Sequence, residues 1–310
     1  MRWEDYRRSD NVEDRRDDGD GGGSGGPGGG GLGGLPIGRG GLGIGGLILV
    51  GLISWATGIN PAILLSGLEM VQGGRQSQYD TARPQQQQQQ RPTSQPTDRQ
   101  GQFASAVLAQ TEDVWRELFK QRGQNYPLPR LVLYTRSTPS ACGQGQTAMG
   151  PFYCPNDRKL YLDLTFFNDL ARRFGAPGEF AAAYVIAHEV GHHVQNVTGI
   201  LPKVNDARQR MSQRDSNALS VRVELQADCY AGIWAYHANS RFKILQDGDI
   251  EQALRAATAI GDDRLQQQSQ GRVVPDAFTH GSSQQRVGWF TRGLRSGDVK
   301  SCDTFQNQQL

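Results

Sequence analysis

The sequence contains few cysteines and few histidines, and its acidic and basic residues nearly balance. Four cysteines and five histidines occur in 310 residues, and the net charge at neutral pH is only +2. No two cysteines stand in the CxxC spacing of thiolate metal sites and redox motifs. No cluster of lysine and arginine residues interleaves with aromatic residues, so the composition gives no support to nucleic-acid binding.

One long stretch, residues 41–68, lacks charged residues altogether. As a helix, residues 41–59 would span about 30 Å, which is enough to cross a bilayer once. Pro61 would end or kink that helix. The alternative is a cleaved secretory signal, but the roughly forty residues that precede the stretch are long for a signal peptide. No clear small-x-small cleavage site follows it. The sequence therefore predicts a retained transmembrane anchor over residues 41–68.

Positive charge flanks this stretch unevenly. Within about twenty residues after it the arginines are Arg75 and Arg83, whereas six precede it: Arg2, Arg7, Arg8, Arg15, Arg16 and Arg39. Because positive residues stay preferentially on the cytoplasmic side, the N-terminus is predicted to be cytoplasmic. The chain after the anchor would then lie outside the cytoplasm.

The composition divides the chain further. Residues 1–40 are charged and then glycine-rich, so they have too little apolar surface to offset chain entropy and are predicted to form a disordered cytoplasmic tail. Residues 69–101 are rich in glutamine and proline and are interpreted as a flexible linker. The remainder, residues 102–310, is large enough for one hydrophobic core.

Within residues 102–310 the apolar pattern predicts strands early and helices later. Residues 131–134 and 159–164 have the alternating, β-branched and aromatic character of strands, and residues 143–151 would connect strands or form a lid. Ser282 and Gln285 resemble a capping box at a helix start. The fold class is therefore α+β, a small sheet followed by packed helices at residues 103–122, 166–174, 178–197, 216–237, 250–268 and 282–294.

The residue pattern HExxH occurs inside the predicted helix 178–197. His188 and His192 are four residues apart, so both imidazoles leave the same helix face one turn apart. This geometry allows two neutral nitrogens to bind one zinc ion, while Glu189 lies beside the metal as a general base for its water. The alternative is a buried helix whose histidines only form hydrogen bonds.

A second pair of residues follows about thirty positions later. Glu224 and Asp228 are one helical turn apart on one face of the predicted helix 216–237. Catalytic zinc sites use three protein ligands, so Glu224 is the predicted third ligand. Asp228 would accept the free N–H of a ligand histidine and so fix the orientation of its ring. Taken alone, the two carboxylates could instead form a solvated acidic edge.

These residues resemble a known pattern. Residues 180–196 and 223–232 are similar to gluzincins, in which HExxH is followed by a downstream Glu-x-x-x-Asp. The segments around Cys142, Cys154 and His280 resemble the family of predicted neutral zinc metallopeptidases, which are bacterial proteins with one membrane segment. The resemblance covers roughly residues 102–305 and extends to the anchored N-terminus. It implies a zincin-like catalytic domain, a Zn²⁺ cofactor and peptidase activity, and says little about the substrate.

The resemblance suggests a mechanism and a place in the cell. The protein would be a single-pass protein of the bacterial inner membrane that hydrolyses peptide or protein substrates on the periplasmic side. An extended peptide would add to the edge of the strand at residues 159–164. The rival interpretation is a zinc-stabilised interaction or assembly domain without proteolytic activity. The retained Glu189 argues against that rival, since a purely structural site has no use for a base.

His280 is the candidate donor for the oxyanion of the tetrahedral intermediate. The run from Thr279 to Arg286 is similar to the His-Pro-x-x-x-x-Arg region of membrane CAAX prenyl proteases, although Gly281 replaces the proline. The alternative is that His280 serves only in helix entry or packing. Arg286 is assigned to a surface or structural ion pair rather than to catalysis.

The other histidines and the cysteines are assigned structural roles. His193 and His237 lie on other helix faces than the ligand residues. The four cysteines are an even number, and Cys142 and Cys154 flank a short glycine-rich excursion, so these two are predicted to pair. Cys229 is then predicted to pair with Cys302. Such disulfides would favour a location outside the cytoplasm, and reduced buried thiols are the alternative.

Overall fold

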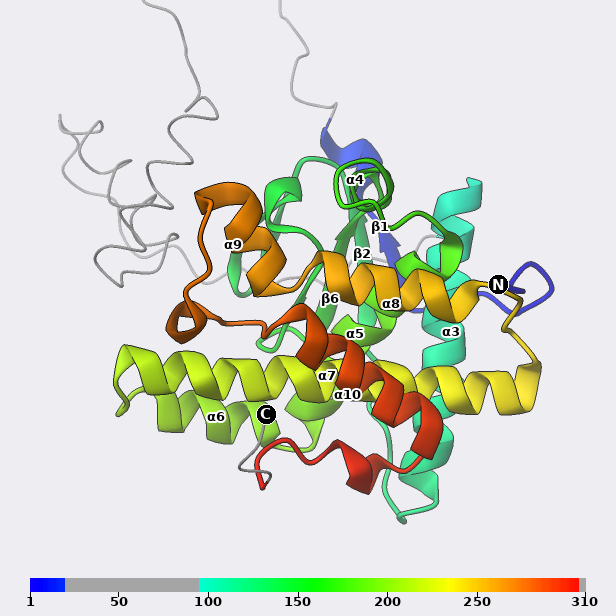
Figure 1. Cartoon of the computed structure of the whole chain (residues 1–310). Coiled ribbons are helices and arrows are strands. Elements are labelled where there is room, and N and C mark those ends of the chain that lie inside the picture. The colour runs from blue at the N-terminus through cyan, green and yellow to red at the C-terminus, as the bar shows by residue number, and fades with distance from the viewer. Residues whose placement is uncertain (20–94, 307–310) are drawn as a thin grey trace, which may run out of the picture. The chain divides into compact units, whose positions relative to one another are not determined.

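The structure is a computed structural model that describes residues 1–19 and 95–306 (Figure 1). Its strands are β1 Val12–Asp14, β2 Arg130–Tyr134, β3 Ser137–Ser140, β4 Gly143–Gln146, β5 Phe152–Cys154 and β6 Lys159–Asp163. Its α-helices are α3 Arg99–Lys120, α4 Thr165–Arg172, α5 Glu179–Val197, α6 Ile200–Arg208, α7 Gln213–Phe242, α8 Asp249–Ala259, α9 Asp262–Gln270 and α10 Ser283–Ser296. Short 3-10 turns are η1 Arg16–Gly19, η2 Thr147–Met149, η3 Pro275–Ala277 and η4 Val299–Cys302.

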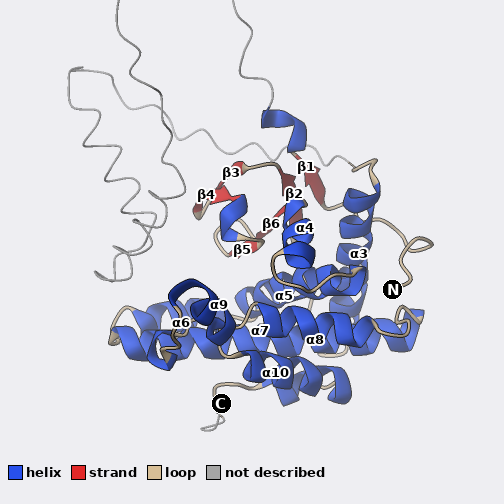
Figure 2. Ribbon diagram, turned by 45° about the horizontal axis from the view of Figure 1, so that its top comes forward, coloured by secondary structure: helices blue, strands red, loops and turns tan. Residues whose placement is uncertain are grey.

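The larger sheet has the strand order β1-β2-β6-β5. Strands β1, β2 and β6 are parallel, with Leu131 opposite Leu160, and β5 runs antiparallel along β6. Leucine, valine and tyrosine dominate β2 and β6, and these strands are buried on both faces, as is usual for parallel strands. Strands β3 and β4 form a separate antiparallel pair. Figure 2 shows the strands gathered to one side of the helices.

Helices α5, α7 and α10 form the centre of the helical layer. Helix α5 is apolar on almost every face, and its first four turns are buried. Gly191 allows α5 to lie directly on α7, because a Cβ atom at this position would come within 3.0 Å of the Ala227 Cα and carbonyl oxygen. On its other side α7 packs along α10 (Figure 1). The close α5–α7 approach brings residues 188–195 beside residues 223–228.

The predicted α+β class, with a small sheet and packed helices, is confirmed. The predicted helix over 250–268 is two helices, α8 and α9, which are separated at Gly261. A Cβ atom on Gly261 would lie 2.5 Å from the Ser283 backbone nitrogen, so close packing against the start of α10 requires glycine there. The capping box of Ser282 and Gln285 is present as predicted. Helix α6 and strands β1, β3, β4 and β5 were not anticipated. Residues 143–151 were predicted to connect strands or form a lid, but their first four residues form strand β4.

The N-terminal residues depart most from expectation. Residues 1–19 were predicted to belong to a disordered tail, but they form part of the same compact unit as the metal-motif helices. Trp3 is buried, and the Met1 amino group lies 3.2 Å from the Asp249 carboxylate. Glu13, also buried, pairs with three cations, from Arg15, Arg130 and Lys159. Composition misled the prediction because these charges are neutralised by partners far along the chain.

The predicted anchor at residues 41–68 and most of the predicted linker at residues 69–101 lie outside the described residues. Within residues 1–19 and 95–306, no helix combines the length and the apolar character needed to span a bilayer. Strand β1 nevertheless constrains the topology, since it pairs with β2 in one sheet. Residues 12–14 and residues 130–134 therefore lie side by side in the described part of the chain.

Both predicted disulfides are confirmed. Cys142 bonds to Cys154, which joins the loop before β4 to the end of β5. Cys229 bonds to Cys302, which ties the C-terminal segment to the middle of α7. No cysteine is left free.

Candidate metal centre

The structure brings His188, His192 and Glu224 together. The Nε2 atom of His188 lies 3.1 Å from one Glu224 oxygen, and the Nε2 atom of His192 lies 3.4 Å from the other. The two imidazole rings are perpendicular, with their centroids 4.8 Å apart. One donor atom from each of the three residues lies within 4.8 Å of the other two. The HExxH helix and the downstream helix therefore converge on one point, as the sequence predicted.

Asp228 lies on the outer side of His188. Its carboxylate is 2.8 Å from the Nδ1 atom of His188 and accepts a hydrogen bond of 2.5 Å from the Tyr184 hydroxyl. Arg286 donates to both oxygens of the same carboxylate, from Nε at 2.8 Å and from Nη2 at 3.0 Å. Asp228 is completely buried, and Arg286 is 2 % exposed. Burial raises the pKa of Asp228, but the charges of Arg286 and His188 outweigh it and lower that pKa to about 2.

Arg286 thus forms an ion pair, as predicted, but not at the surface. Its guanidinium also donates to the Ile260 carbonyl oxygen at 3.2 Å. Arg286 lies in the first turns of α10, and the capping box of α10 fixes where that helix begins. The sequence could not show this depth, because burial of Arg286 depends on how α10 packs against α7.

The outer nitrogen of His192 has a different partner. Its Nδ1 atom lies 2.9 Å from the Oε1 atom of Gln195, one helical turn along α5. Gln195 is fully buried. Sequence reasoning missed this residue, although its spacing of three from His192 places both on one helix face.

Glu189 faces a cleft of about 490 Å³ that the two histidines and Glu224 also line. Its carboxylate makes no hydrogen bond with any residue that the structure describes, and its side chain is 9 % exposed. Burial raises the pKa of Glu189, and the neighbouring imidazoles oppose that shift. A carboxylate that is free of partners and open to the cleft can take part in proton transfer.

His280 lines the same cleft, in the loop before α10. Its Nδ1 atom is 3.2 Å from one oxygen of Asp262, and the other Asp262 oxygen accepts the backbone N–H groups of Thr279, His280 and Gly281. Asp262 therefore shapes the loop and orients the ring. Desolvation lowers the pKa of His280, but Asp262 and Glu224 outweigh it and raise that pKa. No local pattern pointed to Asp262, because it begins a different helix, α9.

Two other histidines lie apart from this cluster. His193 points to the far side of α5, where its ring nitrogens contact the Tyr153 hydroxyl at 3.0 Å and the Pro127 carbonyl oxygen at 2.6 Å. Its burial lowers its pKa to about 4. His237 lies 2.8 Å from the Gly297 carbonyl oxygen at the end of α10. Both positions agree with the structural roles expected of them.

The edge of the cleft also differs from the prediction. Strand β6 was expected to form that edge, but it is flanked by β2 and β5 and is an interior strand. Residues 148–153, which lead into and include most of β5, line the cleft instead. In the described part of the chain β5 pairs only with β6, so its other edge has free backbone groups. The chain reverses after β5, a turn that apolar patterning alone did not reveal.

The donor set fits a zinc ion. Two imidazole nitrogens and one carboxylate oxygen are the ligand set of many catalytic zinc sites. The outer nitrogen of each imidazole already has a hydrogen-bond partner, which leaves both Nε2 atoms free to bind a metal. With both imidazoles neutral, as metal binding requires, the carboxylates of Glu189, Glu224 and Asp228 carry three negative charges against the one positive charge of Arg286. A divalent cation would neutralise the difference.

An α+β unit with an HExxH helix, a downstream glutamate and an open cleft defines the class of zinc metallopeptidase-like proteins. The chain belongs to the family described as "Putative neutral zinc metallopeptidase", whose model matches residues 1–305. That match includes the N-terminal residues that the structure packs against the rest of the unit.

Two relatives show how far the similarity extends. The "Uncharacterized protein YpfJ" of Escherichia coli (strain K12) is 50% identical over 305 residues, which cover 98% of this chain and 99% of that protein. The "Uncharacterized protein Rv2575" of Mycobacterium tuberculosis (strain ATCC 25618 / H37Rv) is 44% identical over 207 residues, which cover 64% and 68% of the two chains. No solved structure matches the chain.

Proposed function

We propose that the protein is a zinc-dependent endopeptidase with a zincin-like catalytic unit, in which His188, His192 and Glu224 bind the metal. The observation that carries this proposal is the convergence of both Nε2 atoms on the two oxygens of Glu224, at 3.1 and 3.4 Å. The family description supports the same activity. A bound zinc ion would supply a Lewis acid and lower the pKa of a coordinated water molecule toward neutrality.

Glu189 acts as the general base. It follows His188 directly on α5 and faces the cleft without a hydrogen-bond partner among the described residues, so its carboxylate is available to the attacking water. It takes a proton from that water and later delivers it to the nitrogen of the departing amine. Burial raises the pKa of Glu189, and a raised pKa makes the carboxylate a stronger base toward the attacking water.

The substrate lies along β5, and His280 faces its scissile carbonyl. An extended peptide can pair with the free edge of β5 through main-chain hydrogen bonds. Phe152, Phe166 and Leu265 contribute apolar lining to the cleft, which suits an apolar substrate side chain next to the scissile bond. His280, held by Asp262, donates a hydrogen bond to the oxyanion that forms at that carbonyl.

Replacing Glu189 by Gln tests this function. The Glu189→Gln variant should keep its zinc and its fold but lose peptide turnover by about 100- to 10,000-fold, the usual contribution of a general base. The matched control is Glu251→Gln, an exposed glutamate of α8 that does not line the cleft. Chelator-sensitive cleavage of a denatured protein mixture by the full-length chain provides the assay. Unchanged turnover in Glu189→Gln would refute the mechanism, and zinc binding without turnover in the wild type would favour an interaction domain.

The same proposal includes a location. Disulfides persist in oxidising compartments, so we place the metal centre outside the cytoplasm, with residues 41–68 as the membrane-associated segment. Because β1 pairs with β2, residues 1–19 belong on the same side. A membrane-impermeant maleimide added to intact spheroplasts should therefore label both Asp10→Cys and Asp276→Cys, two exposed positions. Labelling of Asp276→Cys alone would instead support a single crossing.

A further inference from the structure

A chain of buried amides links His192 to the C-terminal disulfide. The Nε2 atom of Gln195 donates to the Val223 carbonyl oxygen at 2.7 Å and to the Oε1 atom of Gln226 at 3.0 Å. The Nε2 atom of Gln226 donates to the carbonyl oxygen of Cys302 at 3.0 Å. Both glutamine side chains are buried, with exposures of 0 % and 4 %. The chain of contacts thus runs from the metal cleft across α7 to residues of η4.

The two backbone carbonyls fix the direction of every hydrogen bond in this chain. A carbonyl oxygen only accepts, so the atom of Gln226 that faces Cys302 must be its NH2 group, and its Oε1 must face Gln195. Gln195 then has both amide hydrogens engaged, one by Val223 and one by Gln226. Its Oε1 is the atom left to face His192, and that oxygen can only accept.

We propose that Gln195 and Gln226 are positioning residues that hold His192 with its proton on Nδ1 and so present Nε2 to the metal. This inference deepens the proposed zinc site and rests on it. An imidazole with its proton on Nε2 would direct a bare Nδ1 at the Gln195 oxygen and lose the hydrogen bond. The arrangement resembles the role of Asp228 at His188 but contains no charged group.

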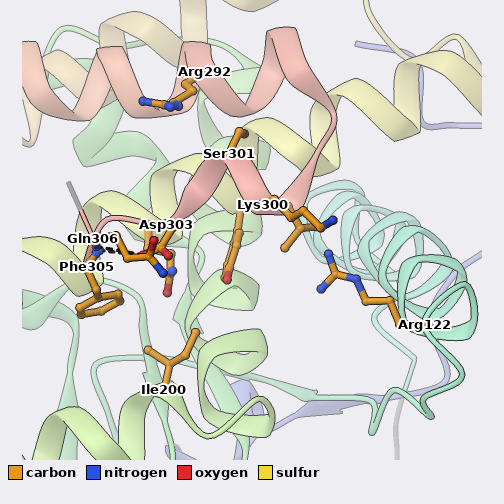
Figure 3. Close-up of a pocket in the computed structure, with 11 residues that line it drawn as sticks. Arg122, Ile200, Arg292, Lys300, Ser301, Asp303, Phe305 and Gln306 are labelled. Carbon is orange, nitrogen blue, oxygen red and sulfur yellow. Dashed lines mark hydrogen bonds between the residues drawn. The ribbon is translucent and has the colours of Figure 1, made fainter.

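We call the hydrogen-bonded path from His192 through Gln195 and Gln226 to the Cys302 carbonyl oxygen the relay. Its far end lies at a second cavity, of about 680 Å³, on the other side of α7. Gln226 lines this cavity together with residues of η4 and the C-terminal segment, and Figure 3 shows Arg122, Arg292 and Lys300 among its walls. The Cys229–Cys302 disulfide fixes the backbone at Cys302, where the relay ends. The tautomer of His192 is therefore set by contacts on the side of α7 that faces away from the substrate cleft.

The first test is zinc affinity, measured by competition with a chelator on the full-length chain. Gln195→Met keeps the length of the side chain but removes the acceptor, and it should weaken zinc binding about 10- to 100-fold, as is usual when the partner of a ligand histidine is lost. Gln226→Met removes the support of Gln195 and should weaken it by a smaller factor. The matched control is Gln110→Met, which should leave the affinity unchanged. Gln110 is a fully buried glutamine of α3 whose side-chain atoms have no hydrogen-bond partner among the described residues.

The second test reads the proton position directly. In the chain labelled with nitrogen-15 histidine, the His192 Nδ1 atom should carry a proton both with and without zinc, and the signal is assigned by its absence in His192→Asn. Gln195→Met should lose that fixed proton position in the zinc-free protein. If Gln195 were purely structural, Gln195→Met would change the thermal stability but neither the zinc affinity nor the position of the His192 proton.

The outcomes separate the two proposals. A zinc affinity within about twofold of wild type in Gln195→Met, or a His192 ring with a proton on Nε2 and none on Nδ1, would overturn the relay. A wild-type chain that fails to bind zinc would overturn the proposed function, while the proton position in the zinc-free protein would still decide the relay.

Discussion

The two imidazoles that face Glu224 are held from behind by different chemistry. His188 contacts a charged cluster in which Asp228, Arg286 and Tyr184 lie in a fully buried environment. His192 contacts the neutral amides of Gln195 and Gln226. Both supports direct Nε2 into the cleft, so orientation of a ligand ring does not require a charge. They should differ in how much stability depends on them and in how they respond to acid.

The largest difference should appear when one member of the charged cluster is removed. Asp228→Asn leaves the Arg286 guanidinium buried without a carboxylate, which typically destabilises a protein by about 3–5 kcal/mol. Denaturant unfolding of the zinc-free chain measures this change. Gln195→Met should cost about 1–3 kcal/mol, because the groups that it leaves unpaired are neutral.

A double variant tests whether the charges of Asp228 and Arg286 are coupled. Asp228→Asn combined with Arg286→Met removes both charges and should recover part of the lost stability, since an unpaired buried charge no longer remains. Zinc affinity should stay low in the double variant, because a neutral amide raises the basicity of the His188 ring less than a carboxylate does. Strictly additive losses in the two single variants would show that the pair is not coupled.

Acid should weaken the charged cluster that contacts His188 and should leave the amides that contact His192 unaffected. The pKa of Asp228 is about 2 in the folded protein, below its ordinary value of 3.8. A carboxyl group with a lowered folded pKa adds stability above its unfolded pKa, and that stability is lost as the pH falls through the folded value. The window is therefore from about pH 4 down to about pH 2, and the loss is roughly 2 kcal/mol. The amides of Gln195 and Gln226 do not titrate.

Unfolding of the zinc-free protein at several pH values checks this expectation. Wild type and Gln195→Met should lose stability with the same slope in that window, whereas Asp228→Asn should show a shallower slope. Equal slopes in all three proteins would mean that Asp228 is not responsible for the acid response.

The smallest effect should distinguish the two disulfides. The relay ends at Cys302, so replacing both Cys229 and Cys302 by Ser should weaken zinc binding several-fold, to roughly the level of Gln226→Met. The control replaces Cys142 and Cys154 by Ser, at a disulfide with no hydrogen-bonded path to His192 among the described residues. Chelator competition measures both double variants. Equal zinc affinities would indicate that the Cys302 carbonyl needs no covalent restraint.

The sequence predicted those features that depend on helical periodicity. The spacing alone places His188 and His192 on one face of their helix and Glu224 and Asp228 on one face of theirs. The α+β class and both disulfides were also predicted correctly. The convergence of the two helix faces depends on the close approach of α5 and α7 at Gly191.

The features that the sequence did not reveal depend on packing between distant segments. Asp262, Gln226 and the buried position of Arg286 acquire their roles only when α7, α9 and α10 meet. Strand β1 was not predicted, because the local composition shows the charge of Glu13 but not the cations that neutralise it. Those cations come from the distant strands β2 and β6.

X-ray absorption at the zinc edge of the full-length chain, loaded with one equivalent of zinc, tests the central claim most directly. The account predicts two imidazole nitrogens at about 2.0–2.1 Å, oxygen ligands at about 2.0–2.2 Å and no sulfur. One imidazole should disappear from the spectrum of His192→Asn. Sulfur at about 2.3 Å, or a zinc ion without two imidazoles, would contradict the account.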